Sequence, residues 1–176
     1  MTENELQILI HSWENLPVVI LHISNHPEHL GILMDLAMDD SHPKNWRAIY
    51  LVDKIHEQHP ELVLPYLPAM TDFLLITKND SKKRHLLKLI SLHDVPAENV
   101  ALLLNYCVDV FTNAALPVAV RVHAMQILFN ISLKEPDFKG ELIDLIEHEI
   151  EHHGSAGICS RGNKLIIKLR LPQSNF

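Results

Sequence analysis

The run Arg121-Val122-His123-Ala124-Met125-Gln126-Ile127-Leu128 sets a basic residue in front of apolar residues at helical spacing. Similar runs begin at Arg47, Arg84 and Arg161, so the four arginines are separated by 37, 37 and 40 residues. Self-similarity at a period of about 20–50 residues is the signature of a repeat protein. The sequence therefore predicts one helix that recurs four times.

A second set of helix starts lies between these runs, and each start combines a proline with an acidic residue. Proline loses no hydrogen bond at the first position of a helix, and an acid in the first turn faces the positive end of the helix dipole. The starts are separated by 33, 36 and 40 residues. They read Pro27-Glu28, Pro60-Glu61, Pro96-Ala97-Glu98 and Pro136-Asp137.

The two sets together predict four helix pairs, in which we name the first helix A and the second helix B. Residues 1–26 hold two shorter helical patterns outside the repeat, and we expect them to cap the apolar end of the array. Residues 167–171 alternate like a strand, but the repeat phase favours a helix there. The A helices are expected over residues 28–39, 61–77, 97–112 and 137–152, and the B helices over 44–58, 82–93, 117–133 and 156–170.

The composition fits a helical chain with a full core. Of the 176 residues 47% are apolar, and ten prolines outnumber five glycines, which disfavours a β-sandwich or barrel with many tight turns. No apolar run approaches the roughly 20 residues that span a bilayer, and the first residues are acidic where a signal peptide is basic. We therefore expect a cytoplasmic protein without a membrane segment. Cys107 and Cys159 stand apart and form no ligand cluster.

Several segments resemble HEAT repeats of the armadillo-type α-solenoid class. Residues 60–70 are similar to the first helix of a HEAT unit, and Val120-Arg121-Val122-His123-Ala124 is similar to the opening of its second helix. Trp46-Arg47-Ala48, Asp53-Lys54-Ile55 and His59-Pro60-Glu61-Leu62 resemble small bacterial HEAT-like proteins without an established activity.

This resemblance covers residues 27–171 and implies an all-α fold. The expected architecture is a right-handed α-α superhelix of about four HEAT-like helix pairs with an N-terminal helical cap. We expect one solenoid domain over residues 1–176. Its parts are the cap at 1–26, repeats at 27–59, 60–95, 96–135 and 136–171, and a tail at 172–176.

Charge is divided between the two kinds of helix. Counted over windows slightly wider than the expected bounds, the B helices hold 13 of the 15 basic residues, whereas the A helices hold 15 of the 22 acids. Since B helices line the concave side of HEAT-like solenoids, the resemblance implies a basic inner face, and such a face concentrates anionic partners. The predicted binding residues are Arg47, Tyr50, Lys54, Lys82, Lys83, Arg84, Lys88, Arg121, Met125, Arg161, Lys164 and Lys168.

Two interpretations of these cations stay open, a binding surface and internal pairing. The four repeat arginines stand where HEAT arginines commonly bond acids of their own or the next repeat, so we expect their charges to be used inside the fold. We expect the lysines at 82, 83, 88, 164 and 168 to face solvent. Trp46, Tyr50, Met125 and Phe129 suggest an apolar trough for a peptide, although such residues at helical spacing are more often core.

The string His148-Glu149-Ile150-Glu151-His152 has the HExxH form of zinc metalloproteases. Catalytic zinc needs a third protein ligand, and residues 154–176 contain no His, Asp or Glu. The favoured interpretation is a solvated acidic helix edge in a chain whose 13 histidines are scattered. We therefore predict no metal, no cofactor and no catalytic residue.

The leading functional hypothesis is a non-catalytic module that binds a segment of a protein partner on its basic concave face. The alternative is nucleic-acid binding, as in HEAT-like DNA glycosylases, whose basic concave face cradles duplex DNA but whose active-site residues have no match here. An enzyme is disfavoured, because no nucleophile, base and orienting group stand at workable spacing.

Overall fold

The computed structural model describes residues 1–95 and 97–171, which are helical throughout apart from turns and loops. The chain divides into two compact units, Met1–Leu89 (unit 1) and Ile90–Phe176 (unit 2). The dividing point falls inside one helix. Pro96 and the expected tail at 172–176 lie outside the described residues.

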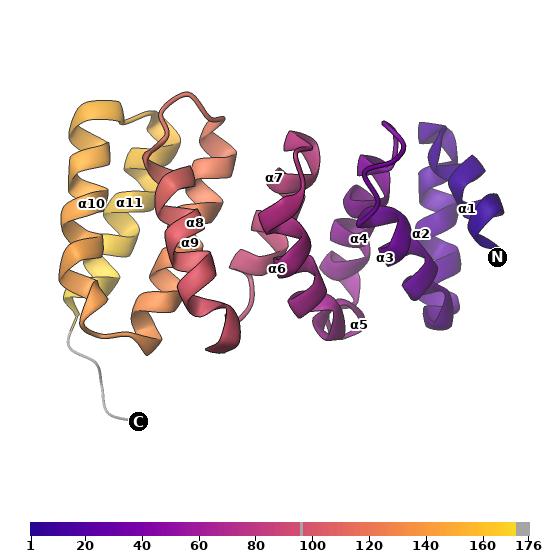
Figure 1. The fold of residues 1–176 in the computed structure, drawn as a ribbon, viewed down its shortest axis with the longest axis horizontal. Helices are drawn as coiled ribbons and strands as arrows, with labels where there is room; N and C mark the ends of the chain where they lie inside the picture. Colours follow the sequence, from indigo (N-terminus) through magenta and orange to yellow (C-terminus); the bar gives the residue numbers. More distant parts are fainter. Residues whose placement is uncertain (96, 172–176) are drawn as a thin grey trace. The chain divides into compact units, whose positions relative to one another are not determined.

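Unit 1 begins with the two helices of the expected cap, which pack on the helices that follow them (Figure 1). The cap helices are α1 (Glu3–Ile10) and α2 (Leu16–Asn25), with the short η1 (Trp13–Asn15) between them. The rest of the unit comprises η2 (Pro27–His29), α3 (Leu30–Ala37), α4 (Trp46–Gln58), α5 (Pro60–Val63), η3 (Leu64–Tyr66), α6 (Leu67–Ile76) and most of α7 (Asp80–Ser91).

Unit 2 contains two helix pairs, α8 with α9 and α10 with α11 (Figure 1). Helix α9 also packs against α10 and α11, so one apolar core joins the two pairs. The helices are η4 (Ala97–Asn99), α8 (Val100–Thr112), α9 (Val118–Lys134), α10 (Phe138–His153) and α11 (Ala156–Arg170).

Local chemistry explains where the helices begin. Thr2 and Glu5 form a reciprocal capping box at the start of α1, and the Ser155 side chain accepts a hydrogen bond from the backbone N–H of Ile158 at the start of α11. Every A and B helix expected from the repeat is present, and residues 167–170 are helical, so the strand alternative is wrong.

One expected helix, over residues 61–77, is interrupted. Residues 64–66 form a 3₁₀ turn between α5 and α6. Pro65 and Pro68 each lack a backbone N–H, and a proline ring clashes with the carbonyl four residues earlier, so a continuous α-helix cannot run through this segment. The sequence predicted the helical segment but not its break.

The repeat period appears in the contacts between neighbouring repeats. The Thr77 hydroxyl donates to Oδ2 of Asp40, 37 positions earlier, at 2.7 Å. The Asn130 side-chain amide donates to the carbonyl of His93, again 37 positions earlier. Residues one period apart thus meet, as expected of repeats that contact only their neighbours.

Candidate functional site

Two of the predicted cations, Lys54 on α4 and Lys88 on α7, take part in a charge network within unit 1. Lys88 Nζ lies 2.7 Å from Oδ1 of the buried Asp53 and 3.1 Å from Oε1 of Glu57. Lys54 Nζ lies 2.8 Å from Oε2 of Glu57, and His85 Nδ1 lies 3.0 Å from Oδ2 of Asp53. The charges of Lys54 and Lys88 are therefore neutralised by neighbouring carboxylates within the same unit.

The network sets the ionisation of its buried carboxylate. Burial alone would raise the pKa of Asp53, but hydrogen bonds from His85 and Lys88 outweigh burial and hold that pKa below its usual value. The Glu57 pKa is also lowered, by hydrogen bonds from Lys54 and Lys88. Both acids are thus ionised near neutral pH and neutralise the lysines beside them.

Lys82 does not face solvent, and the expectation that it does is wrong. Its side chain is fully buried, and Nζ lies 3.0 Å from Oδ1 of Asp40 and 2.6 Å from the carbonyl of Asp39. The ammonium group thus holds the loop after α3 against α7. Lys83, the next residue, is half-buried and lies 3.7 Å from the exposed Asp80.

Arg121 and Met125 are both buried, so neither can line a surface. The prediction that they belong to the binding face is wrong. Arg121 Nη2 donates to Oε2 of Glu149 at 2.6 Å, and its Nε donates to the carbonyl of Phe111. The expected internal pairing of a repeat arginine is confirmed here. Phe129 is also buried, which removes the apolar centre of the expected trough.

The other repeat arginines differ from Arg121. Arg47 Nη1 donates to two carbonyl oxygens, those of Ile10 at 3.1 Å and His11 at 2.6 Å, and not to an acid. Arg84 and Arg161 are exposed, and Arg161 donates to the side chain of Gln126. Pairing with an acid is therefore wrong for Arg47 and Arg161.

An uncompensated basic stripe remains on α11. Arg161, Lys164 and Lys168 are exposed on one side of this helix, and neither α9 nor α11 contains an acidic residue. Lys168 Nζ lies 5.9 Å from the centroid of the Phe129 ring. We name these three residues the α11 stripe. It is a part of the predicted basic face that has no acidic residue on its own helix or on α9.

An exposed aromatic cluster lies in unit 1, and the sequence indicated only two of its three members. The Trp13 ring meets Trp46 at 5.6 Å and Tyr50 at 5.5 Å, both edge to face. Trp46 and Tyr50 lie one turn apart on α4, as their spacing predicted. Trp13 lies in η1, outside the repeat phase, so the repeat pattern gave no signal for it. We name Trp13, Trp46 and Tyr50 the aromatic cluster.

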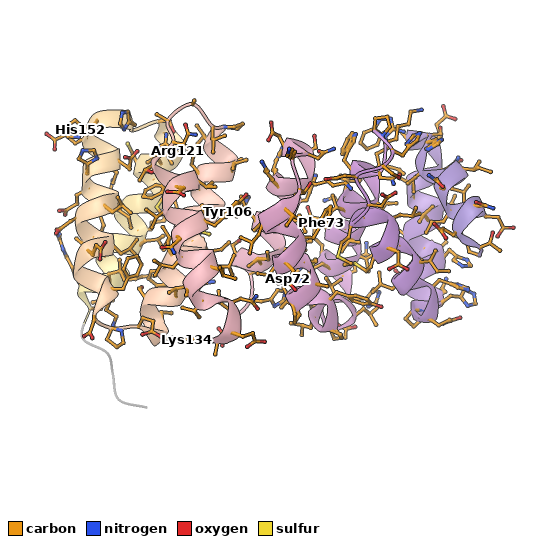
Figure 2. All side chains as sticks on the ribbon, in the orientation of Figure 1. Asp72, Phe73, Tyr106, Arg121, Lys134 and His152 are labelled. Atoms are coloured by element: carbon orange, nitrogen blue, oxygen red, sulfur yellow. The ribbon has the colours of Figure 1, made fainter. Side chains whose placement is uncertain are left out.

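The HExxH string offers no open zinc site. Glu149, its would-be base, is buried and paired with Arg121, while the His148 and His152 rings stack on each other at 4.3 Å. Figure 2 shows Arg121 and His152 toward the same end of unit 2, with Lys134 at the other end. Within residues 1–95 and 97–171, no group of three or more His, Cys, Asp or Glu side chains is arranged to hold a metal ion.

Three histidines gather where the cap meets the first repeat. His22 Nε2 and His29 Nδ1 share a hydrogen bond of 3.0 Å, and the His26 ring lies 4.8 Å from the His22 ring. Burial lowers the pKa of His22, and His26 and His29 lower it further when they carry charge. The contact needs one nitrogen that donates and one that accepts, so His22 and His29 cannot both carry a charge while it is kept.

A family model described as a HEAT repeat domain matches residues 3–168. No curated protein and no solved structure matches the chain. In the part of the chain that the structure describes, no helix combines the length and the apolar character needed to cross a membrane.

Proposed function

The chain belongs to the HEAT-repeat family, and from that premise we propose that it is a non-catalytic module that binds a segment of a protein partner on surfaces of its B helices. HEAT repeats are commonly protein-interaction modules. Stacked repeats present long surfaces suited to extended partners. The buried pairing of Glu149 with Arg121 further supports a role without catalysis, because it occupies the carboxylate of the HExxH string.

The observation that carries the proposal is the α11 stripe. Three exposed cations stand on a helix without an acid, next to a helix without an acid, whereas α10 holds five acids. Such a separation of charge concentrates an anionic partner on one face. An acidic protein segment fits this face of unit 2.

A protein segment is favoured over nucleic acid because much of the expected basic face is already neutralised. Lys54, Lys82 and Lys88 each lie within ion-pair distance of a carboxylate. A phosphate backbone is bound through several cations at once, with affinity that falls steeply with salt. Nucleic acid is the second candidate, because the α11 stripe still offers cations that could bind phosphate groups.

Affinity capture from the native cell extract with the wild-type chain and two charge-reversal variants tests the proposal. Lys164→Glu with Lys168→Glu should remove captured partners. Lys78→Glu with Lys139→Glu makes the same change in net charge on the A-helix side of the repeats and should retain them. Partners that survive the first variant, or are lost equally from both, would exclude the α11 stripe as the binding surface.

Titration with duplex DNA distinguishes the second candidate. At 150 mM salt, non-specific binding to nucleic acid has dissociation constants of roughly 10⁻⁴–10⁻⁶ M. If the surface binds protein, its affinity for duplex DNA should not exceed this non-specific range. Tighter binding that falls steeply with salt and disappears in the Lys164→Glu, Lys168→Glu variant would replace the protein partner by nucleic acid.

A further inference from the structure

The aromatic cluster exposes ring surface that the core does not use. Trp13 is 50% exposed, and Trp46 and Tyr50 are half-buried. Large aromatic side chains dominate the energetics of cores and of interfaces, and Trp and Tyr are enriched among the residues that carry most of the binding energy. Trp13 in contact with two further rings at the surface marks a place where a partner would bury aromatic area.

A fixed cation lies against this cluster. The Arg47 guanidinium carbon is 4.8 Å from the centroid of the Trp13 ring, and two backbone carbonyls hold Nη1 in place. No carboxylate of the described residues forms an ion pair with Arg47. Lys54 Nζ lies 5.9 Å from the centroid of the Tyr50 ring. Lys54 is paired with Glu57, so Arg47 is the cation beside the cluster that can complement a carboxylate of a partner.

The geometry of the rings limits the form of the partner. Trp46 and Tyr50 are inclined at 62° and 77° to the plane of Trp13, so the rings make angled walls and not one flat face. Aromatic walls of this kind bind polyproline-type segments, whose preformed extended conformation loses little entropy on binding. An amphipathic helix would need an apolar groove long enough for anchors over two turns.

We propose that the aromatic cluster binds an extended, proline-containing acidic peptide segment of a partner protein, with proline against the rings and a carboxylate beside Arg47. This inference rests on the proposed function as a protein-binding module and names the chemistry of the bound segment. Single-stranded nucleic acid can also stack on aromatic rings. It is disfavoured because the nearby Lys54 and Lys88 are already neutralised by Asp53 and Glu57.

Selection of random 12-residue peptides displayed on phage tests this inference with the whole chain as bait. The selected peptides should be enriched in proline together with Asp or Glu. Replacing their prolines by alanine, or their acids by lysine, should weaken binding to the wild-type chain at least about tenfold, which is the loss of a single strong contact. Enrichment of helical apolar peptides, or of peptides without acids, would overturn the proposal.

Variants of Trp13 locate the site. Trp13→Ala should weaken the selected peptides at least about tenfold, whereas Trp13→Phe, which keeps a ring, should stay within about threefold of wild type. Circular dichroism and thermal melting establish that both variants are folded. Unchanged binding by a folded Trp13→Ala variant would overturn the proposal.

Two further comparisons separate this inference from the proposed function. If Trp13→Ala retains every partner captured from extract while Lys164→Glu with Lys168→Glu loses them, the proposed function stands and the aromatic site is wrong. Oligo(dT) that quenches the fluorescence of the two tryptophans at 150 mM salt, and displaces the peptides, would assign the cluster to nucleic acid instead.

Discussion

The ammonium group of Lys82 lies 3.0 Å from Oδ1 of Asp40, although the Lys82 side chain is fully buried. The same ammonium donates to the carbonyl of Asp39, and Thr77 donates to the other carboxylate oxygen of Asp40. Lysine is almost never fully buried unless it is paired. The charge of Lys82 therefore belongs to the fold, where it joins α7 to the loop after α3.

Reversal of this charge should destabilise the protein strongly. Lys82→Glu would place a buried carboxylate beside Asp40, and we expect it to lower the free energy of unfolding by more than about 3 kcal/mol. Lys83→Glu makes the same chemical change at the next residue, which is partly exposed, and should cost at most about 0.5 kcal/mol. Urea denaturation measures both variants. Equal losses would show that the Lys82 contact carries no special stability.

The pair formed by Arg121 and Glu149 should behave like a buried ion pair. Glu149→Gln leaves the Arg121 charge buried without a carboxylate, so we expect a loss of about 3–5 kcal/mol in the free energy of unfolding. His148→Ala with His152→Ala alters exposed rings and should cost about 1 kcal/mol or less in total. Urea denaturation compares these variants, and a larger effect of the histidine pair would contradict the structure.

Zinc should affect neither the stability nor any hydrolytic activity of the chain. Metal analysis of protein purified without an affinity tag should find no stoichiometric zinc, and a chelator should leave the melting temperature unchanged. Stoichiometric zinc that disappears in the His148→Ala, His152→Ala variant would show that the string binds metal in spite of the Glu149 pairing.

Stability should fall as the pH drops below the ordinary histidine pKa of 6.5. Burial lowers the pKa of His11, His22 and His56 in the folded chain, so the unfolded chain binds more protons in this range. The contribution of these histidines is complete above about pH 6.5 and is lost as the pH falls toward their folded pKa values.

Urea denaturation between pH 7.5 and 5.5 measures this dependence above the range in which carboxylates are protonated. His22→Gln should flatten the curve, because glutamine has no proton to gain. If the stability of the wild type stays constant to pH 5.5, or if its slope with pH is unchanged in the variant, folding does not lower the pKa values of these histidines.

The helices were predictable from the sequence because they rest on local and periodic signals. Proline, acid and arginine recur at a nearly fixed spacing. The positions of α8 to α11 along the chain follow from this spacing. The break of α5 from α6 was missed because Pro65 and Pro68 stand inside a segment that matches the first helix of a HEAT unit.

The partners of the charges were not predictable in the same way. Whether a lysine faces solvent depends on which loop of the previous repeat reaches it, and Lys82 meets Asp40 from 42 positions away. Lys83, the next residue, points about 100° away from Lys82 around the helix axis and has a different environment. Trp13 was missed because it lies in the cap, where the period that related Trp46 and Tyr50 does not apply.

The last prediction concerns the cap, whose inner and outer faces are distinguished by two isoleucines on α1. Ile10 is fully buried, whereas Ile8 is 69% exposed. Ile10→Ala should lower the free energy of unfolding by about 2–4 kcal/mol, and Ile8→Ala should change it by at most about 0.5 kcal/mol.

Because each repeat depends on its neighbours and α7 runs across the point that divides the two units, we expect one calorimetric transition that moves as a whole in the Ile10 variant. Two transitions, of which only one responds to Ile10→Ala, would show that the two units unfold separately and that the cap stabilises only the first.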